Sequence, residues 1–126
     1  MIRLLLVEDD ANLSYMIQAA LEDMIGDYEV TIANNGQEGL EAYRQDKPDV
    51  IVADIEMPVM DGYEATKEIR KYSAKVPIIA ITAFAYASDE QRVMESGFDG
   101  YMPKPINARL LKAQLTEIMQ KRIILL

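Results

Sequence analysis

The sequence predicts an α/β protein with one doubly wound parallel sheet, and three observations support this fold class. Short apolar runs alternate five times with longer segments of helical periodicity, a pattern typical of βα units that feed a parallel sheet. Three of the runs are apolar throughout, as strands covered by helices on both faces should be. The 126 residues, half of them hydrophobic, suit a single domain over residues 1–126 without a separate output domain.

The five expected strands differ in pattern, and the patterns indicate their places in the sheet. The uninterrupted apolar runs at residues 4–7, 50–53 and 78–81 should form the central strands. Residues 28–32 alternate apolar and polar side chains and residues 100–102 form a very short run, so we expect both at the edges. Edges at the second and fifth strands fit the flavodoxin-like order 2-1-3-4-5. In that order, ligands bind at the carboxyl ends of the first and third strands.

Helical spacing and capping residues mark the expected helices. The inward faces of the first and last helices should consist of Leu13, Met16, Ile17, Ala20, Leu21 and Met24, and of Leu111, Leu115, Ile118 and Met119. Residues suited to a helix start are Asn35, Ser88 and Asn107, and glycines suited to a helix end are Gly26 and Gly97. These segments connect successive strands, as a doubly wound sheet requires.

The composition excludes several kinds of function. The formal charge of −8, with basic residues scattered among more numerous acids, argues against direct nucleic-acid binding. Without Cys or His, the chain offers no disulfide, no thiolate metal site and no imidazole base, so any chemistry must use carboxylates, hydroxyls and lysine. The apolar start stops at Glu8 and no stretch is long enough to cross a membrane. We therefore expect no leader, no membrane insertion and a cytoplasmic location.

Acidic residues follow two neighbouring strands of the expected sheet. Glu8, Asp9 and Asp10 end the first strand and Asp54 ends the third, so their carboxylates should meet across strands about 4.8 Å apart. Two carboxylates about 4 Å apart repel by roughly 4 kcal/mol at an effective dielectric near 20, which favours a bound cation. Oxygen ligands without His or Cys suit Mg²⁺. We expect Glu8, Asp9 and Asp54 to form this site, and Asp10 only to solvate the loop.

Two further strand ends should open onto the same edge of the sheet. Thr82 ends the fourth strand with a hydroxyl, and Lys104 follows the fifth strand with a positive charge. Either residue alone would be an ordinary strand terminus or surface charge. Together with Asp54 and a divalent cation they form a set suited to phosphoryl transfer, in which positioning and charge neutralisation do most of the catalytic work.

The residues at these strand ends resemble a known family. Glu8-Asp9, Asp54, Thr82 and Lys104-Pro105, with Met57-Pro58-x-x-Asp61-Gly62 after the third strand, are similar to the motifs of two-component response regulator receiver domains. The resemblance covers essentially the whole chain, and residues 54–66 are most similar to receivers fused to hybrid histidine kinases. It implies a phosphorelay signalling phosphoprotein rather than an enzyme, one that catalyses its own phosphorylation and dephosphorylation.

The resemblance also implies a role for each residue of the acidic group. Asp54 would accept a phosphoryl group from a phosphohistidine and become an aspartyl phosphate. Asp9, Asp54 and the backbone carbonyl of Glu56 would bind Mg²⁺, with Glu8 assisting through a water molecule. Glu56 and Phe84, two positions beyond the acceptor and the threonine, would tune the lifetime of the phosphoryl group, and we hypothesise that Phe84 lengthens it by shielding.

Further residues are implied to bind the phosphoryl group and to report its presence. Lys104, Thr82 and the backbone of Ala83 would contact the phosphoryl oxygens. Thr82 moving toward the phosphate would let Tyr101 turn inward, which would alter the face formed by the fourth helix, fifth strand and fifth helix. The family also implies a cis peptide bond before Pro105.

The resemblance implies partners as well. A sensor histidine kinase, a histidine phosphotransfer domain or both would exchange phosphoryl groups with the chain. The resemblance leaves open whether the chain forms a dimer on phosphorylation. The chain could stand alone or be the cytoplasmic part of a membrane-bound hybrid kinase.

Three other functions compete with a receiver. A phosphatase of the haloacid-dehalogenase kind shares the chemistry but places its nucleophile on the first strand, whereas Asp54 follows the third. A nucleotide binder of the same fold needs a Gly- or Ser-rich loop after the first strand, where acids would repel phosphate. A docking module that is never phosphorylated would lack the acceptor or the lysine, and both are present here.

Overall fold

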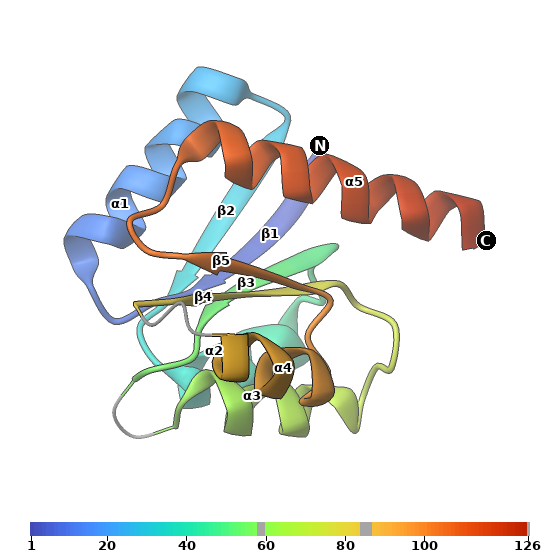
Figure 1. Cartoon of the computed structure of the whole chain (residues 1–126). Helices are drawn as coiled ribbons and strands as arrows, with labels where there is room; N and C mark the ends of the chain where they lie inside the picture. The colour runs from blue at the N-terminus through green and yellow to red at the C-terminus, as the bar shows by residue number, and fades with distance from the viewer. Residues whose placement is uncertain (58–59, 84–86, 126) are drawn as a thin grey trace.

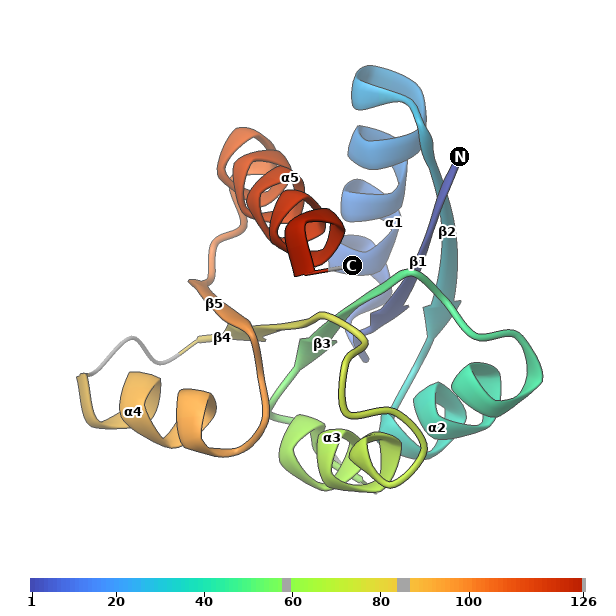
Figure 2. The same ribbon diagram turned by 90° about the vertical axis from the view of Figure 1, so that its right-hand side faces the viewer.

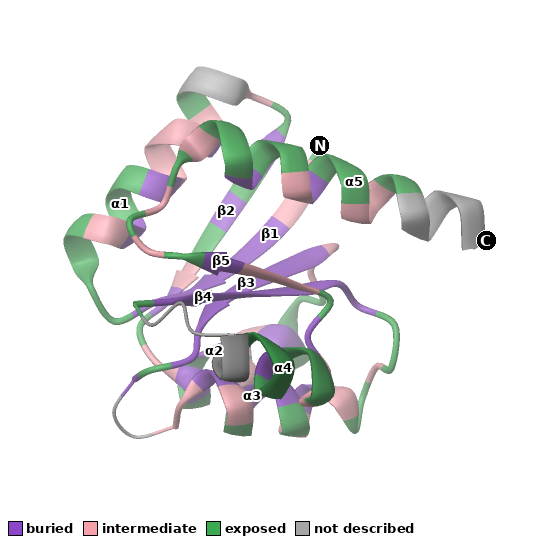
Figure 3. Ribbon diagram, viewed as in Figure 1, coloured by how far each residue is buried: buried purple, intermediate pink, exposed green. Residues whose placement is uncertain are grey.

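A computed structural model describes residues 1–57, 60–83 and 87–125 of the chain (Figure 1). Its centre is a parallel sheet of five strands in the order β2-β1-β3-β4-β5, which confirms the predicted order. The strands are β1 (Ile2–Val7), β2 (Tyr28–Ala33), β3 (Val50–Asp54), β4 (Ile78–Thr82) and β5 (Gly100–Pro103). All residues of β3 and β4 are buried, as their continuous apolar sequences predict (Figure 3).

Helices cover both faces of the sheet. They are α1 (Ala11–Ala19), a π-helical turn η1 (Ala20–Ile25), α2 (Gly36–Gln45), α3 (Gly62–Arg70), α4 (Ala87–Glu95) and α5 (Ala108–Leu125). Figure 2 shows α1 and α5 on one face and α2, α3 and α4 on the other. Within the part of the chain that the structure describes, no helix is both long and apolar enough to cross a membrane.

The alternation of side chains along β1 divides the core into two layers. Leu4 and Leu6 pack with Leu111 and other residues of the α1 and α5 side, whereas Leu5 and Val7 pack with residues of the α2, α3 and α4 side. Successive side chains of a strand point to opposite faces, so a strand covered on both sides must be apolar at every position. This requirement explains why β1 has no polar residue between Leu4 and Val7.

The helix starts follow the predicted capping residues. The side chain of Asn35 accepts a hydrogen bond from the backbone N–H of Glu38 at 2.9 Å, and that of Asn107 accepts from the N–H of Arg109 at 2.9 Å. Each cap satisfies a donor that the first helical turn leaves without an intrahelical partner. The side chain of Ser88 lies outside the described residues.

The segment after α1 differs from the expected regular helix. The chain continues as a π-helical turn and ends at Gly26, whose φ of 76° is a conformation that glycine adopts without strain. Ile17 and Leu21 are buried as predicted, but Met16 is 51% exposed. Met16 lines a groove together with Ile106, which precedes α5, and Leu111 of α5. The prediction that Met16 faces inward was therefore wrong.

Candidate phosphoryl-acceptor site

The carboxyl ends of four strands bring the expected site residues to one edge of the sheet. Val7 lies beside Ala53 in the sheet register, and Asp54 lies beside Ile81. Backbone hydrogen bonds continue one residue beyond these strands, because the N–H of Ile55 donates to the carbonyl of Ile81 at 3.1 Å. The N–H of Lys104 likewise donates to the carbonyl of Thr82 at 2.7 Å. These bonds position the loops that carry the polar side chains.

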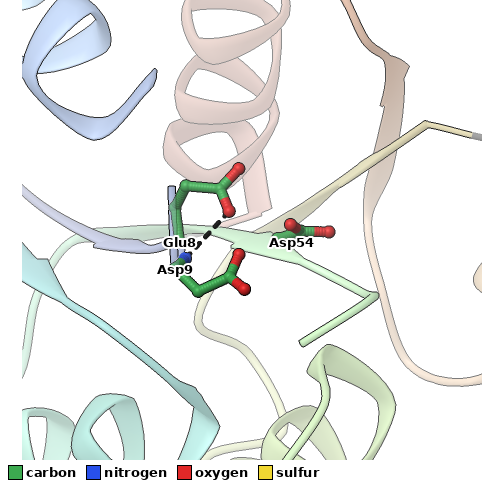
Figure 4. Close-up of side chains that lie close together, drawn as sticks. All are labelled: Glu8, Asp9 and Asp54. Atoms are coloured by element: carbon green, nitrogen blue, oxygen red, sulfur yellow. Dashed lines mark hydrogen bonds between the residues drawn. The ribbon is translucent and has the colours of Figure 1, made fainter. Parts of the chain in front are cut away.

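Glu8, Asp9 and Asp54 form a compact acidic cluster (Figure 4). One carboxylate oxygen of each residue lies within 4.8 Å of the others, and no other such cluster occurs among the residues whose side chains the structure describes. Glu8 is fully buried and Asp54 is 2% exposed, whereas Asp9 is exposed. Glu8 Oε2 accepts a hydrogen bond from the backbone N–H of Asp9 at 2.9 Å, which orients its carboxylate.

Lys104 bridges the two buried carboxylates. Its Nζ lies 2.8 Å from Glu8 Oε1 and 2.9 Å from Asp54 Oδ2, and its side chain is 25% exposed. Burial, and then the neighbouring Asp54 carboxylate, raises the pKa of Glu8 to about 8. Burial alone would lower the pKa of Lys104, but its contacts with Glu8 and Asp54 outweigh burial and raise that pKa. Two buried carboxyl groups therefore share one ammonium group.

The donor set at this edge fits a divalent cation. Glu8 Oε1 is buried and accepts no aligned hydrogen bond from the described residues, although Lys104 Nζ is near. The ammonium group offsets part of the cost of burying this oxygen, and a water molecule or metal ion would supply the hydrogen bond or coordination that it lacks. All side-chain donors in the cluster are carboxylate oxygens, which suit Mg²⁺ and leave room for metal-bound water.

Thr82 makes a contact that the sequence did not predict. It is fully buried at the end of β4, and its hydroxyl donates a hydrogen bond to Glu56 Oε1. The backbone N–H of Glu56 in turn donates to Asp54 Oδ1 at 2.9 Å. The family resemblance implies only a metal-binding carbonyl for Glu56 and an influence on the lifetime of the phosphoryl group. No local pattern indicates that its side chain turns toward β4, since the contact spans 26 positions along the chain.

The remaining expected residues lie around the same edge or outside the described chain. Tyr101 is partly buried on β5 and packs on the core layer beneath α2, α3 and α4. Ala83 is exposed directly after β4, and the Lys104–Pro105 peptide bond is cis, as the resemblance implies. Phe84 lies outside the described residues.

The acid that was expected only to solvate its loop has a structural role. Asp10 caps α1, because its Oδ1 accepts hydrogen bonds from the backbone N–H groups of Asn12 at 2.9 Å and Leu13 at 3.2 Å. Asp61 caps α3 in the same way, by accepting from the N–H of Glu64 at 2.9 Å. These caps tie the loops after β1 and β3 to the helices that follow, and so support the cluster between them.

Comparison with known proteins identifies the family. A sequence model of the response regulator receiver domain matches residues 4–116. The probable transcriptional regulator ycf27 of Guillardia theta is 38% identical over 119 residues, which cover 94% of this chain and 46% of that protein. The sensor histidine kinase RcsC of Escherichia coli K12 is 35% identical over 113 residues, which cover 90% of this chain and 12% of that protein.

A solved structure agrees with this result. The similar structure is the receiver domain of the sensor histidine kinase PA1611 of Pseudomonas aeruginosa PAO1, with 33% sequence identity and a TM-score of 0.85. The match covers 94% of this chain and 98% of that chain. That structure is described with a magnesium ion coordinated in its active site cleft. The chain belongs to the response regulator receiver-domain family of two-component systems. It spans less than half the length of the curated relatives described above.

Proposed function

We propose that Asp54 of this receiver domain is the phosphoryl acceptor, and that it takes the group from a phosphohistidine. The observation that carries the proposal is the placement of its carboxylate at the carboxyl edge of the sheet. There Oδ2 contacts Lys104, Oδ1 accepts from the backbone of Glu56, and the carboxylates of Glu8 and Asp9 lie close by. A carboxylate nucleophile beside a fixed cation and oxygen ligands for a metal is an arrangement suited to phosphoryl transfer.

In the proposed transfer, one bond to phosphorus forms as another breaks. An oxygen of Asp54 forms a bond to phosphorus while the bond from phosphorus to the donor's imidazole nitrogen breaks. The nitrogen keeps the electron pair, and the released imidazole takes up a proton from solvent according to its own pKa. Later attack of water on phosphorus releases inorganic phosphate and restores the carboxylate. In this proposal the domain promotes both steps on itself.

Each neighbouring residue has a distinct role in this proposal. Lys104 would neutralise charge on the phosphoryl oxygens, and the hydroxyl of Thr82 and the backbone N–H of Ala83 would donate hydrogen bonds to them. Asp9, Asp54 and the carbonyl of Glu56 would hold Mg²⁺, with Glu8 assisting through a water molecule. When bound, Mg²⁺ would supply further positive charge to the phosphoryl oxygens.

The proposal extends to the switch and the partners. Movement of Thr82 toward the phosphoryl group would let Tyr101 turn inward and alter the surface of α4, β5 and α5. Similarity both to a transcriptional regulator and to a sensor kinase supports a histidine kinase or histidine phosphotransfer domain as donor. A histidine kinase takes its phosphoryl group from ATP, which is available in the cytoplasm. We therefore expect the domain that receives the group to lie in the cytoplasm.

A small phosphodonor tests the proposal directly. The protein should gain one phosphoryl group from acetyl phosphate in the presence of Mg²⁺, as intact mass spectrometry would show, and EDTA should prevent the gain. Asp54→Asn keeps the size of the side chain and should abolish the gain, whereas Asp61→Asn, which alters a capping acid on the same loop, should retain it. Failure of the wild type to become phosphorylated, or equal phosphorylation of Asp54→Asn, would overturn the proposal.

A further inference from the structure

The hydroxyl of Thr82 is already engaged by a charged acceptor in the resting protein. Thr82 is fully buried, and its Oγ1 donates to Glu56 Oε1 on the loop after the neighbouring strand. A hydroxyl has a single hydrogen to donate. In the proposed function, that hydrogen must be donated to a phosphoryl oxygen, so Glu56 and the phosphoryl group compete for the same donor.

We infer that Glu56 is a positioning residue whose side chain holds the Thr82 hydroxyl in its resting orientation and thereby opposes the phosphorylated state. The inference rests on the proposed function of Asp54 and Thr82. It assigns the Glu56 side chain a task separate from that of its backbone carbonyl.

The backbone around Glu56 gives this interaction a fixed starting point. The N–H of Glu56 donates to Asp54 Oδ1 at 2.9 Å, and the N–H of the preceding residue, Ile55, donates to the carbonyl of Ile81 at 3.1 Å. Ile81 precedes Thr82, so the two ends of the interaction are joined through the backbone of adjacent strands. The Glu56 side chain therefore reaches Thr82 from a defined position.

The charge of Glu56 strengthens its hold on the hydroxyl. A hydrogen bond to a carboxylate is roughly twice as strong as one between neutral groups. Glu56 as a whole is exposed, so water can solvate its carboxylate once Thr82 turns away. The interaction can then break on phosphorylation without leaving a buried charge, as a reversible switch contact requires.

Two substitutions separate the hydrogen bond from the charge. Glu56→Gln removes the charge but keeps an acceptor oxygen, whereas Glu56→Met has a similar length and removes both. Both variants keep the backbone N–H and carbonyl of residue 56. Glu64→Gln, at an exposed position in the first turn of α3, controls for the loss of one negative charge elsewhere on the same side of the sheet.

Two measurements report the interaction. NMR of the Thr82 methyl group, through its carbon shift and three-bond couplings, gives the side-chain rotamer in the metal-free, unphosphorylated protein. Titration with beryllofluoride in the presence of saturating Mg²⁺ gives the affinity for an analogue of the phosphoryl group. The Mg²⁺ affinity of each variant, measured separately, shows whether the backbone ligand is intact.

We expect Glu56→Met to redistribute the Thr82 rotamers and to bind beryllofluoride about threefold to tenfold more tightly than Glu56→Gln, the range expected for one partly exposed hydrogen bond. Glu64→Gln should match the wild type in both measurements. Equal affinities for the Gln and Met variants, with Thr82 rotamers unchanged, would overturn the inference and leave only a charge effect. If the wild type bound no beryllofluoride, the proposed function would fail. The rotamer measurement would still decide the inference, since unchanged rotamers in Glu56→Met overturn it and altered rotamers support it.

Discussion

Replacing Glu8 with glutamine should stabilise the metal-free protein at neutral pH. Glu8 is fully buried, and its carboxylate lies against that of Asp54 with Lys104 as the ammonium group that bridges them. Glutamine has nearly the same shape and can still accept the hydrogen bond that the backbone N–H of Asp9 donates. The substitution therefore removes a buried acid that is ionised in the unfolded chain at neutral pH and takes up a proton on folding, while keeping the shape of the side chain.

The pKa of Glu8 sets the size of the effect and its dependence on pH. Burial, and then Asp54, raises this pKa from 4.5 to about 8, so the folded protein holds the proton more tightly than the unfolded chain. The stability that this proton contributes is fully present below pH 4.5 and is lost as the pH rises through about 8. Between pH 5.5 and pH 7.5 the wild type should lose about 2 to 3 kcal/mol from this group alone.

Urea denaturation in EDTA at the two pH values measures this change. The stability advantage of Glu8→Gln over the wild type should grow by about 2 to 3 kcal/mol from pH 5.5 to pH 7.5, and Glu64→Gln should show no such growth. Saturating Mg²⁺ should stabilise the wild type more than Glu8→Gln, because the cation offsets the same charge. A Glu8→Gln variant that followed the pH dependence of the wild type would refute the reasoning.

Three further predictions follow from contacts described above. Lys104→Met leaves the buried carboxylate of Asp54, and the protonated Glu8 beside it, without their ammonium partner. It should lower the free energy of unfolding of the metal-free protein by about 3 kcal/mol at neutral pH. An unchanged urea midpoint would contradict this. Gly62→Ala would place a Cβ 2.5 Å from the backbone oxygen of Asp54, so it should cost about 2 kcal/mol or more in thermal or chemical unfolding and slow phosphorylation. A variant as stable as the wild type would show that this loop can shift freely. Burial raises the pKa of Tyr28, so this tyrosine's contribution to stability is present below pH 10 and lost as the pH rises above it. Tyr28→Phe should therefore gain stability relative to the wild type only in alkaline denaturation series, and a gain of equal size at pH 7 would argue against ionisation as its cause.

The general layout of the site could be predicted because it depends on local patterns. Strands covered on both faces are apolar throughout. Polar residues at the end of any strand, or directly after it, must lie at the carboxyl edge of a parallel sheet. Glu8, Asp54, Thr82 and Lys104 all satisfy this condition, and the structure brings them to one edge. Capping side chains such as that of Asn35 are equally local, since donor and acceptor lie within one helical turn.

The contacts within the site could not be predicted in the same way. The bond from Thr82 to Glu56 joins residues 26 positions apart, and the bond from Lys104 to Asp54 joins residues 50 apart. Such contacts depend on strand register and on rotamers chosen in a crowded environment, which no local pattern contains. The exposure of Met16 has a similar cause, because only the position of α5 decides how much of the α1 surface is covered.

The sequence by itself determined the fold class, the strand order and the set of acidic, hydroxyl and lysine side chains available for chemistry, because each follows from periodicity or from residue type. The tertiary structure alone decided the charge balance of the site and the resting partner of the Thr82 hydroxyl. Lys104 is shared between two buried carboxylates, and Thr82 donates to Glu56. Both results depend on distances between separate strands, and electrostatic and hydrogen-bond energies change steeply over those few ångströms.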